Sequence, residues 1–536
     1  MADLIWKVVA SLLLLVLPSI LLFWVFRRRR AHGLFRRNGI PGPEPELFWG
    51  NWKQLKKNRI QVLQQWIEEY GQVFGFFMAE KPWMVVTDLN LVRQIFVTEA
   101  NTFTDRPQYV IDVEPFSSAL PFLPGDEWKK VRPVLNTSLT AGKMNLLSGI
   151  VSECSREFLE VLRKHHERND MVNFVEAAEG YALDVITRVG LTWNVADLKR
   201  WGHQCPLKLD DVFSTESDVL YQGSLPRWIF EDLDKTAVEN TLAQPGIRTI
   251  LRYLYPLTSF SKVLGRIAKN VRDTVHKRRQ GQAPRENDIL QTMLDAQDGI
   301  EDKTRDSCLP LEHGAWRKKG THKNGLLIED RHLTSNSIMV LIANFETTSA
   351  TIGFTLHLLA THPEEQDKLF LEIDAMLPQS SDTSLDNLQK LTRLDMVVKE
   401  SLRLYPPLPV LITRVCPRNT TVMEQFIPAG TTVVAPAWHI HRSPQFWSDP
   451  SKFLPDRFAQ DRPERHPFAY FPFGLGPRSC FGKRLGVLQV KTAIVEILRN
   501  YRVVPCEETV DPITVTVPNV LLRPVGGIKL RLVSRR

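Results

Sequence analysis

Cys480 lies in a glycine-rich turn whose composition suits a thiolate that binds a metal ion. Residues 473–482 read Phe-Gly-Leu-Gly-Pro-Arg-Ser-Cys-Phe-Gly, with Arg478 two positions before the cysteine. Glycines let the backbone approach a flat ligand and adopt positive φ. Apolar spacing over residues 485–497 predicts a following helix, whose N-terminal N–H groups favour thiolate over thiol. A lone cysteine is usually a buried structural residue, but this setting favours an axial metal ligand.

A carboxylate and neighbouring hydroxyls interrupt an apolar run at residues 338–349. Glu346 and Thr347 stand side by side there, in a stretch whose spacing predicts a long helix. A threonine hydroxyl inside a helix can donate to the carbonyl one turn back and loosen the backbone, which leaves room for a water or a diatomic ligand. A solvated stripe on a buried helix is the alternative explanation of this pattern.

Two further pairs have helical spacing. Trp128 and Arg132 are four residues apart on one predicted helix face, and their N–H donors suit a carboxylate. Glu400 and Arg403 place opposite charges three residues apart, an arrangement that contributes under about 1 kcal/mol when it is exposed.

The N-terminus has the pattern of a membrane anchor. Residues 4–26 are almost continuously apolar despite Lys7 and Pro18, and about 20 residues span a bilayer as a helix. Trp6 and Trp24 fall near the two predicted interfaces, and four arginines follow at 27–30. The positive-inside rule then places the body in the cytosol. A cleaved signal peptide would carry the reverse charge asymmetry and a small-residue cleavage site.

Charge and cysteine content limit the class of protein. The chain has 536 residues and a net charge of +8. Within residues 1–40, seven Lys and Arg against Asp3 alone give +6, so the rest is nearly neutral and no nucleic-acid partner is expected. The six cysteines are scattered without zinc spacing or a CxxC pair, which indicates a reducing compartment rather than a disulfide framework.

Periodicity predicts a mainly α body with a smaller β-sheet region, positioned after the anchor. We expect a membrane anchor at 1–30, a basic and proline-rich hinge at 31–50, and one catalytic domain at 51–536. A polar stretch at 297–327 is expected to be a surface loop. Strands are expected near 72–88, 422–436 and 511–533, and helices at 147–165, 328–361 and 391–405.

Residues 473–482 resemble the heme-binding loop of the cytochromes P450, Phe-x-x-Gly-x-Arg-x-Cys-x-Gly, at every fixed position. The resemblance extends from residue 40 to the end of the chain. It implies the cytochrome P450 fold with an N-terminal transmembrane helix. It also implies heme b as cofactor, with Cys480 as the iron ligand and with Phe473 and Arg478 in the cofactor site.

Other segments carry the same resemblance. Residues 343–348 are similar to the family's oxygen-binding motif, in which Glu346 and Thr347 match the acid–alcohol pair that delivers protons. Asn344 replaces the usual glycine there, and its side chain could crowd the oxygen groove or hydrogen-bond into it. The resemblance assigns the heme propionates to Trp128, Arg132, Arg414, Arg478 and Arg106, and a structural triad to Glu400, Arg403 and Arg457.

The implied activity is a membrane-bound monooxygenase that inserts one oxygen atom of O2 into a lipophilic substrate. Electrons would come from NADPH through NADPH–cytochrome P450 reductase, with cytochrome b5 as a second candidate donor. The implied location is the endoplasmic reticulum membrane, single-pass, with membrane lipids around the anchor and the catalytic domain in the cytosol. An acidic donor would be steered by a basic patch of Lys129, Lys130, Lys483 and Arg484.

Two alternatives remain. Residues 466–474 and 478–486 resemble the branch of xenobiotic-metabolising cytochromes P450 that also contains thromboxane synthase. A heme-thiolate isomerase of a lipid endoperoxide, which needs no reductase, is therefore the main rival, although retention of Thr347 favours the monooxygenase. A non-catalytic heme sensor is the other. The resemblance places the substrate pocket at the largely apolar segments 109–123, 408–412 and 518–521.

Overall fold

The computed structural model describes most of the chain. Most of the predicted loop at 297–327 and parts of the predicted pocket segments at 109–123, 408–412 and 518–521 lie outside the described residues. The described residues are 2–107, 113–193, 253, 255–257, 259–299, 328–377, 383–410, 412–460, 466–517 and 520–535.

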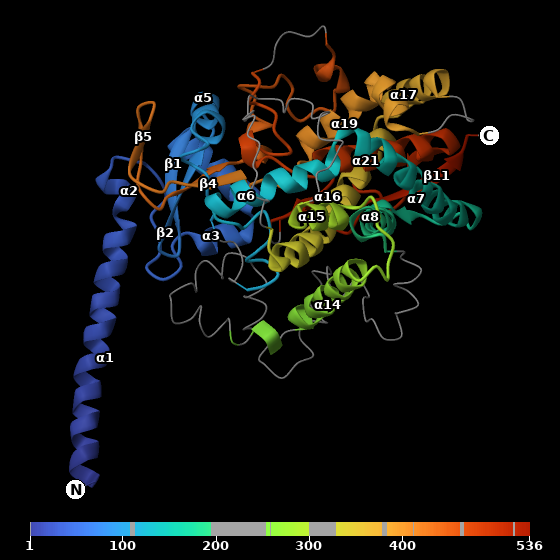
Figure 1. The fold of residues 1–536 in the computed structure, drawn as a ribbon. Coiled ribbons are helices and arrows are strands. Elements are labelled where there is room, and N and C mark those ends of the chain that lie inside the picture. The colour runs from blue at the N-terminus through green and yellow to red at the C-terminus, as the bar shows by residue number, and fades with distance from the viewer. Residues whose placement is uncertain are drawn as a thin grey trace.

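Helices dominate the described part of the chain (Figure 1). They are α1 (Ala2–His32), α2 (Leu34–Arg37), α3 (Trp52–Lys57), α4 (Arg59–Tyr70), α5 (Leu89–Arg93), α6 (Gly125–Asn136), α7 (Ala141–Glu167), α8 (Phe174–Leu191), α14 (Ser259–Arg279), α15 (Ile289–Gln297), α16 (Asp330–Thr361), α17 (Pro363–Met376), α18 (Leu385–Lys390), α19 (Thr392–Leu404), α20 (Ala437–Ile440) and α21 (Lys483–Asn500).

The strands form small sheets. The largest has the order β1-β2-β7-β4, in which β2 and β7 are parallel and the other pairs antiparallel. Its strands are β1 (Val73–Met78), β2 (Lys81–Val86), β4 (Ile412–Val415) and β7 (Thr432–Ala435). The smaller sheets are β3-β11-β8, β5-β6 and β10-β9, built from β3 (Val172–Asn173), β5 (Thr420–Val422), β6 (Gln425–Ile427), β8 (Tyr501–Pro505), β9 (Val515–Thr516), β10 (Arg523–Pro524) and β11 (Lys529–Ser534).

These elements confirm the mainly α body with a smaller sheet region. The three predicted helices correspond to α7, α16 and α19, with ends that differ by several residues at most. The three strand regions correspond to β1 with β2, β6 with β7, and β9 to β11. The short strands β3, β4 and β8 and most of β5 lie outside the predicted strand regions.

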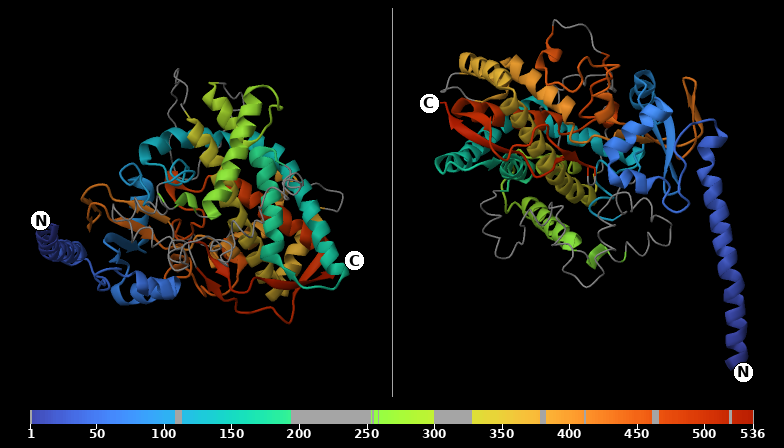
Figure 2. Two further views of the ribbon diagram at one scale, coloured as in Figure 1. Left: turned by 90° about the horizontal axis from the view of Figure 1, so that it is seen from below. Right: turned by 180° about the vertical axis from the view of Figure 1, so that it is seen from behind.

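The long helix α16 forms the centre of the body. It packs against α8, α21 and α19, and other helices surround it in both views of Figure 2. A capping box formed by Glu329 and His332 begins this helix, and it ends before Pro363, which starts α17. Most of its side chains are buried, and these include polar residues as well as the apolar run that starts at Ile338.

The N-terminal helix α1 extends away from the body (Figure 1), but its C-terminal end is attached to it. Arg28 is only 3% exposed, and its guanidinium donates to the carbonyls of Leu47 (3.0 Å) and Phe48 (2.6 Å) and pairs with Glu80 (3.1 Å). His32 Nε2 lies 2.7 Å from the Ala79 carbonyl. One arginine of the basic block is therefore a structural contact of the body.

Among the described residues, the helix that is long and apolar enough to cross a membrane is α16, and 61% of that stretch is buried within the body. It is therefore best understood as a core helix. The anchor expected at 1–30 stays a prediction, because the side chains of most of residues 1–17 lie outside the described part of the chain.

Glu400 and Arg403 are completely buried on α19, so they are not the exposed pair considered above. The carboxylate of Glu400 accepts two hydrogen bonds from Arg403 (2.7 and 2.8 Å) and one from Arg457 (3.2 Å). Arg403 also donates to the carbonyls of His441 and Pro450, both at 2.8 Å. The triad thus fixes a long irregular segment, and its role is structural.

We expect Glu400→Gln to destabilise the protein by about 3–5 kcal/mol, because it leaves the guanidinium of Arg403 buried without its carboxylate. The measurement is urea unfolding followed by circular dichroism. The matched control is Lys399→Gln, which removes a partly exposed ion pair with Asp395 (2.6 Å) and should cost under about 1 kcal/mol. Equal unfolding midpoints for the two variants would contradict a structural role for the triad.

Candidate functional site

The backbone around Cys480 follows a tight path that requires glycine. Gly474 and Gly476 have φ of +79° and +63°, and a Cβ on Gly476 would lie 2.0 Å from the carbonyl oxygen of Phe96. The Cys480 N–H donates to the Phe473 carbonyl (2.8 Å), which closes the turn. The thiol remains accessible although it lies deep in the body, three residues before α21 begins.

Two opposing effects act on the pKa of the Cys480 thiol. Burial is the largest, and it raises the pKa of Cys480 above its ordinary value. Backbone N–H groups of Gly482 and Lys483, together with the charges of Arg132 and Arg106, oppose this and lower the pKa. The predicted preference for thiolate from the helix N-terminus is therefore present but is outweighed by burial. A metal cation would shift the balance, since the thiolate is the metal-binding form.

Arginines from three separate segments converge on the loop that carries Cys480. The donors are those predicted from the sequence, and each donates to a backbone carbonyl of this loop. The bonds run from Arg106 to Arg478 O (2.7 Å), from Arg132 to Ser479 O (2.9 Å) and from Arg414 to Leu475 O (3.1 Å). These side chains therefore surround the loop in space, whereas their contact with heme propionates stays a prediction.

Arg478 and Trp128 complete the group. The guanidinium of Arg478 lies over the Trp128 ring, 4.5 Å from its centroid, and donates to the carbonyls of Thr104 (3.0 Å) and Leu123 (2.9 Å). Trp128 and Arg132 are both buried on α6, four residues apart as predicted. Arg478 thereby links the Cys480 loop to α6 and to the segment that precedes α6.

This cluster concentrates positive charge in a poorly solvated place. Desolvation lowers the pKa of Arg132 to about 10 and that of Arg478 to about 9, and Arg106 adds repulsion to both. Buried cations of this kind need an anion. No group of three His, Cys, Asp or Glu side chains able to hold a metal occurs in the described parts of the chain. An anionic prosthetic group that brings most of its own metal ligands, such as heme with its two propionates, fits this donor set.

Thr347 has the local geometry predicted for it, whereas Glu346 has a partner that was not predicted. Thr347 Oγ1 donates to the Ala343 carbonyl (2.7 Å), and Ala343 is exposed although it lies in the middle of the core helix. Glu346 forms an ion pair with Arg523 on β10 (2.6 Å). The two neighbouring side chains are thus engaged with different parts of the protein.

The Glu346 carboxylate lines a cavity of about 170 Å³ between α16, the start of α8 and the C-terminal segment. Burial raises its pKa, and Arg523 partly offsets that rise. Arg523 is 177 positions away in sequence, so no local pattern could have revealed this pair. The amide of Asn344 bonds to Gln489 and to the Ala182 carbonyl, so it is engaged with α21 and α8.

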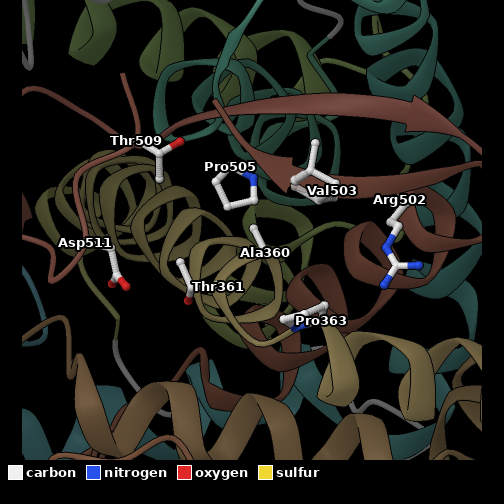
Figure 3. A pocket seen from close by; sticks show the side chains of 9 residues that line it. Ala360, Thr361, Pro363, Arg502, Val503, Pro505, Thr509 and Asp511 are labelled. Atoms are coloured by element: carbon white, nitrogen blue, oxygen red, sulfur yellow. The ribbon is translucent and has the colours of Figure 1, made fainter. Parts of the chain in front are cut away.

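A larger hollow of about 420 Å³ lies at the C-terminal end of α16 (Figure 3). Its charged lining groups are paired within the protein, Arg502 with Asp367 (2.8 Å) and Asp511 with His357 (3.3 Å). None of the residues predicted for the functional site lines it. It therefore offers no chemistry related to Cys480.

Comparisons with known proteins match nearly the whole chain. The family model for Cytochrome P450 matches residues 40–531. The chain is 32% identical to cytochrome P450 3A6 of Oryctolagus cuniculus over 524 residues, which is 97% of this chain and 96% of that protein. It is 30% identical to cytochrome P450 3A5 of Homo sapiens over 537 residues (99% and 98%), and 30% identical to cytochrome P450 3A41 of Mus musculus over 526 residues (97% and 96%).

We expect Cys480→Ser to abolish the red-shifted absorption band that carbon monoxide gives with a ferrous thiolate heme, because serine offers no thiolate. The control is Cys506→Ser, which changes a half-buried thiol bonded to the Lys529 carbonyl (3.5 Å). That variant should keep the band. A Cys480→Ser protein that still shows the band would exclude Cys480 as the iron ligand.

Proposed function

The chain belongs to the cytochrome P450 family of monooxygenases, and on that premise we propose that it inserts one oxygen atom of O2 into a lipophilic substrate at the endoplasmic reticulum membrane, with electrons from NADPH. The observation that carries the proposal is the convergence of buried and half-buried arginines on the loop that holds the accessible Cys480 thiol. A chain that only needed a folded core would have no reason to desolvate these charges together.

Each residue of the cluster has a role in holding heme b. Cys480 is the iron ligand, and Phe473 shapes the turn in front of it through its carbonyl. The donors for the propionates are Arg106, Trp128, Arg132, Arg414 and Arg478. When bound, the heme supplies the iron at which O2 is reduced and split, and a thiolate ligand favours O–O cleavage.

Thr347 and Glu346 manage protons next to that chemistry. Thr347 holds its proton on the hydroxyl that now donates to the Ala343 carbonyl, a bond whose loss costs about 1 kcal/mol, so the hydroxyl can turn readily. Glu346, with its raised pKa and its position in a cavity, exchanges protons with solvent. Arg523 restrains the Glu346 carboxylate, so proton transfer from Glu346 to Thr347 requires that this ion pair loosen.

The anchor is supported by the apolar surface of α1. Ile20, Leu21, Leu22, Phe23 and Phe26 are each at least 58% exposed, and nothing in the described body covers them. Burying one such side chain in lipid is favourable by about 1.5–3 kcal/mol. This arrangement supports a single span, with the arginine block and the body on the cytosolic side, where the reductase and cytochrome b5 would act.

The basic patch predicted for an acidic electron donor is composed of exposed side chains. Lys129, Lys130, Lys483 and Arg484 are all exposed, on α6 and at the start of α21. Both elements adjoin the loop of Cys480. Their charge would steer an acidic protein surface to that side of the body, which supports NADPH–cytochrome P450 reductase as the partner.

One observation favours the rival function, isomerisation of a lipid endoperoxide. The ion pair of Glu346 with Arg523 holds the predicted proton donor away from Thr347. An isomerase needs neither protons nor a reductase, because its substrate already contains the oxygen. The two functions differ in their dependence on NADPH and on Thr347.

We expect Thr347→Ala to bind heme normally but to form several-fold less product per NADPH consumed, because the hydroxyl that holds a proton at this position is lost. The control is Thr361→Ala, which removes the same kind of bond to a carbonyl one turn back (3.0 Å to His357 O) at the far end of α16. The measurement is product formed per NADPH with a panel of lipophilic substrates. Equal coupling in wild type and Thr347→Ala would contradict the mechanism argued for Thr347, and full turnover without NADPH would support the isomerase instead.

We expect protease added to sealed microsomes to digest the body of the protein, since the arginine block places it on the outer, cytosolic face. A fragment that contains the anchor should remain with the membrane after washing at high pH. Full protection of the body until detergent is added would contradict this topology.

A further inference from the structure

We propose that Asn344 is a positioning residue. Through Gln489, it sets the place of α21, and thus of Cys480, relative to the face of α16 that carries Thr347. The inference rests on the proposed binding of heme by Cys480, and it assigns a role to the residue that departs from the family's glycine.

The side chains of Asn344 and Gln489 form a reciprocal amide pair. Gln489 Nε2 donates to Asn344 Oδ1 (2.7 Å), and Asn344 Nδ2 donates to Gln489 Oε1 (3.2 Å). Asn344 Nδ2 also donates to the Ala182 carbonyl on α8 (3.0 Å). Gln489 is completely buried. A buried amide must have its partners, so this pair requires one relative placement of the two helices.

The pair lies between the two halves of the functional site. Asn344 is next to Ala343 and three residues before Thr347 on α16, while Gln489 is on α21, which begins three residues after Cys480. Because Gln489 is six residues into α21, it lies only about 9 Å along the axis from the start of that helix. A shift of α21 along α16 would therefore move Cys480 relative to Thr347 by a similar amount.

A third helix reinforces the contact. The Tyr181 hydroxyl on α8 donates to the backbone carbonyl of Gln489 (3.0 Å), and Thr348 Oγ1 lies 3.4 Å from Asn344 Oδ1. Buried apolar side chains of α16 and α21 belong to the same core, and the dispersion forces between them have little directionality. The hydrogen bonds of an amide pair are directional and are lost after a displacement of about 1 Å.

The test is a double-mutant cycle in the full-length, heme-loaded protein, with the variants Asn344→Gly, Gln489→Leu and both together. Two quantities are measured: the apparent melting temperature, and the rate at which the red-shifted carbon monoxide band converts to the band of a heme that has lost its thiolate. Each single variant leaves one amide or its backbone partner unsatisfied, and we expect each to speed this conversion about tenfold.

The double variant removes both polar groups. We expect it to convert more slowly than the product of the two single effects would give, because the second substitution removes an amide already left without its partner. Gln366→Leu is the matched control: it also removes a fully buried amide, bonded to the carbonyls of Leu359 and Val503 (both 2.9 Å), but on α17. It should lower the melting temperature without speeding the band conversion.

Two results would overturn the inference alone: additive effects in the cycle, or single variants that lower the melting temperature as Gln366→Leu does but leave the conversion rate unchanged. A wild-type protein with no red-shifted band would instead overturn the proposed function, and this inference with it. Asn344→Gly alone could fail to fold. The Gln489→Leu and double variants then still test the inference, since only a coupled pair predicts that the double variant folds better than Asn344→Gly.

Discussion

The burial of positive charge around one loop is the constraint on which the rest of this structure depends. Arg132, Arg414 and Arg478 are each less than a tenth exposed and lie close to the Cys480 turn. Guanidinium groups are costly to desolvate, so α6, β4 and the turn must hold them with carbonyls and must leave room for an anion. The accessible thiol and the glycines of the turn serve the same need, because both leave space where a packed core would have side chains.

The features that could be predicted from the sequence are those encoded within one short segment. The turn around Cys480, the four-residue spacing of Trp128 and Arg132, and the bond of Thr347 to the carbonyl one turn back all depend on neighbours in the chain. The long helix α16 was predicted for the same reason. Arg106 and Arg414 are different, because only the family resemblance pointed to them, and the structure then placed both against the Cys480 loop.

What could not be predicted depends on pairs of residues far apart in the chain. Glu346 with Arg523, Asn344 with Gln489, and Arg28 with Glu80 are separated by 177, 145 and 52 positions. Only the folded chain brings these partners together, and no spacing pattern in the sequence indicates which residue pairs with which. The thiol of Cys480 shows a related limit: the helix N-terminus was predicted, whereas the larger effect of burial on its pKa depends on the whole surrounding body.

The contact of Arg28 with the body fixes the direction in which α1 extends. Its 31 residues form a rod roughly 46 Å long, fixed at one end by Arg28 and His32. A rotation of about 5° at that end displaces the far tip by roughly 4 Å. Glu80, in the turn between β1 and β2, thus helps to fix the direction of the whole helix, although it is 52 positions from Arg28 in sequence.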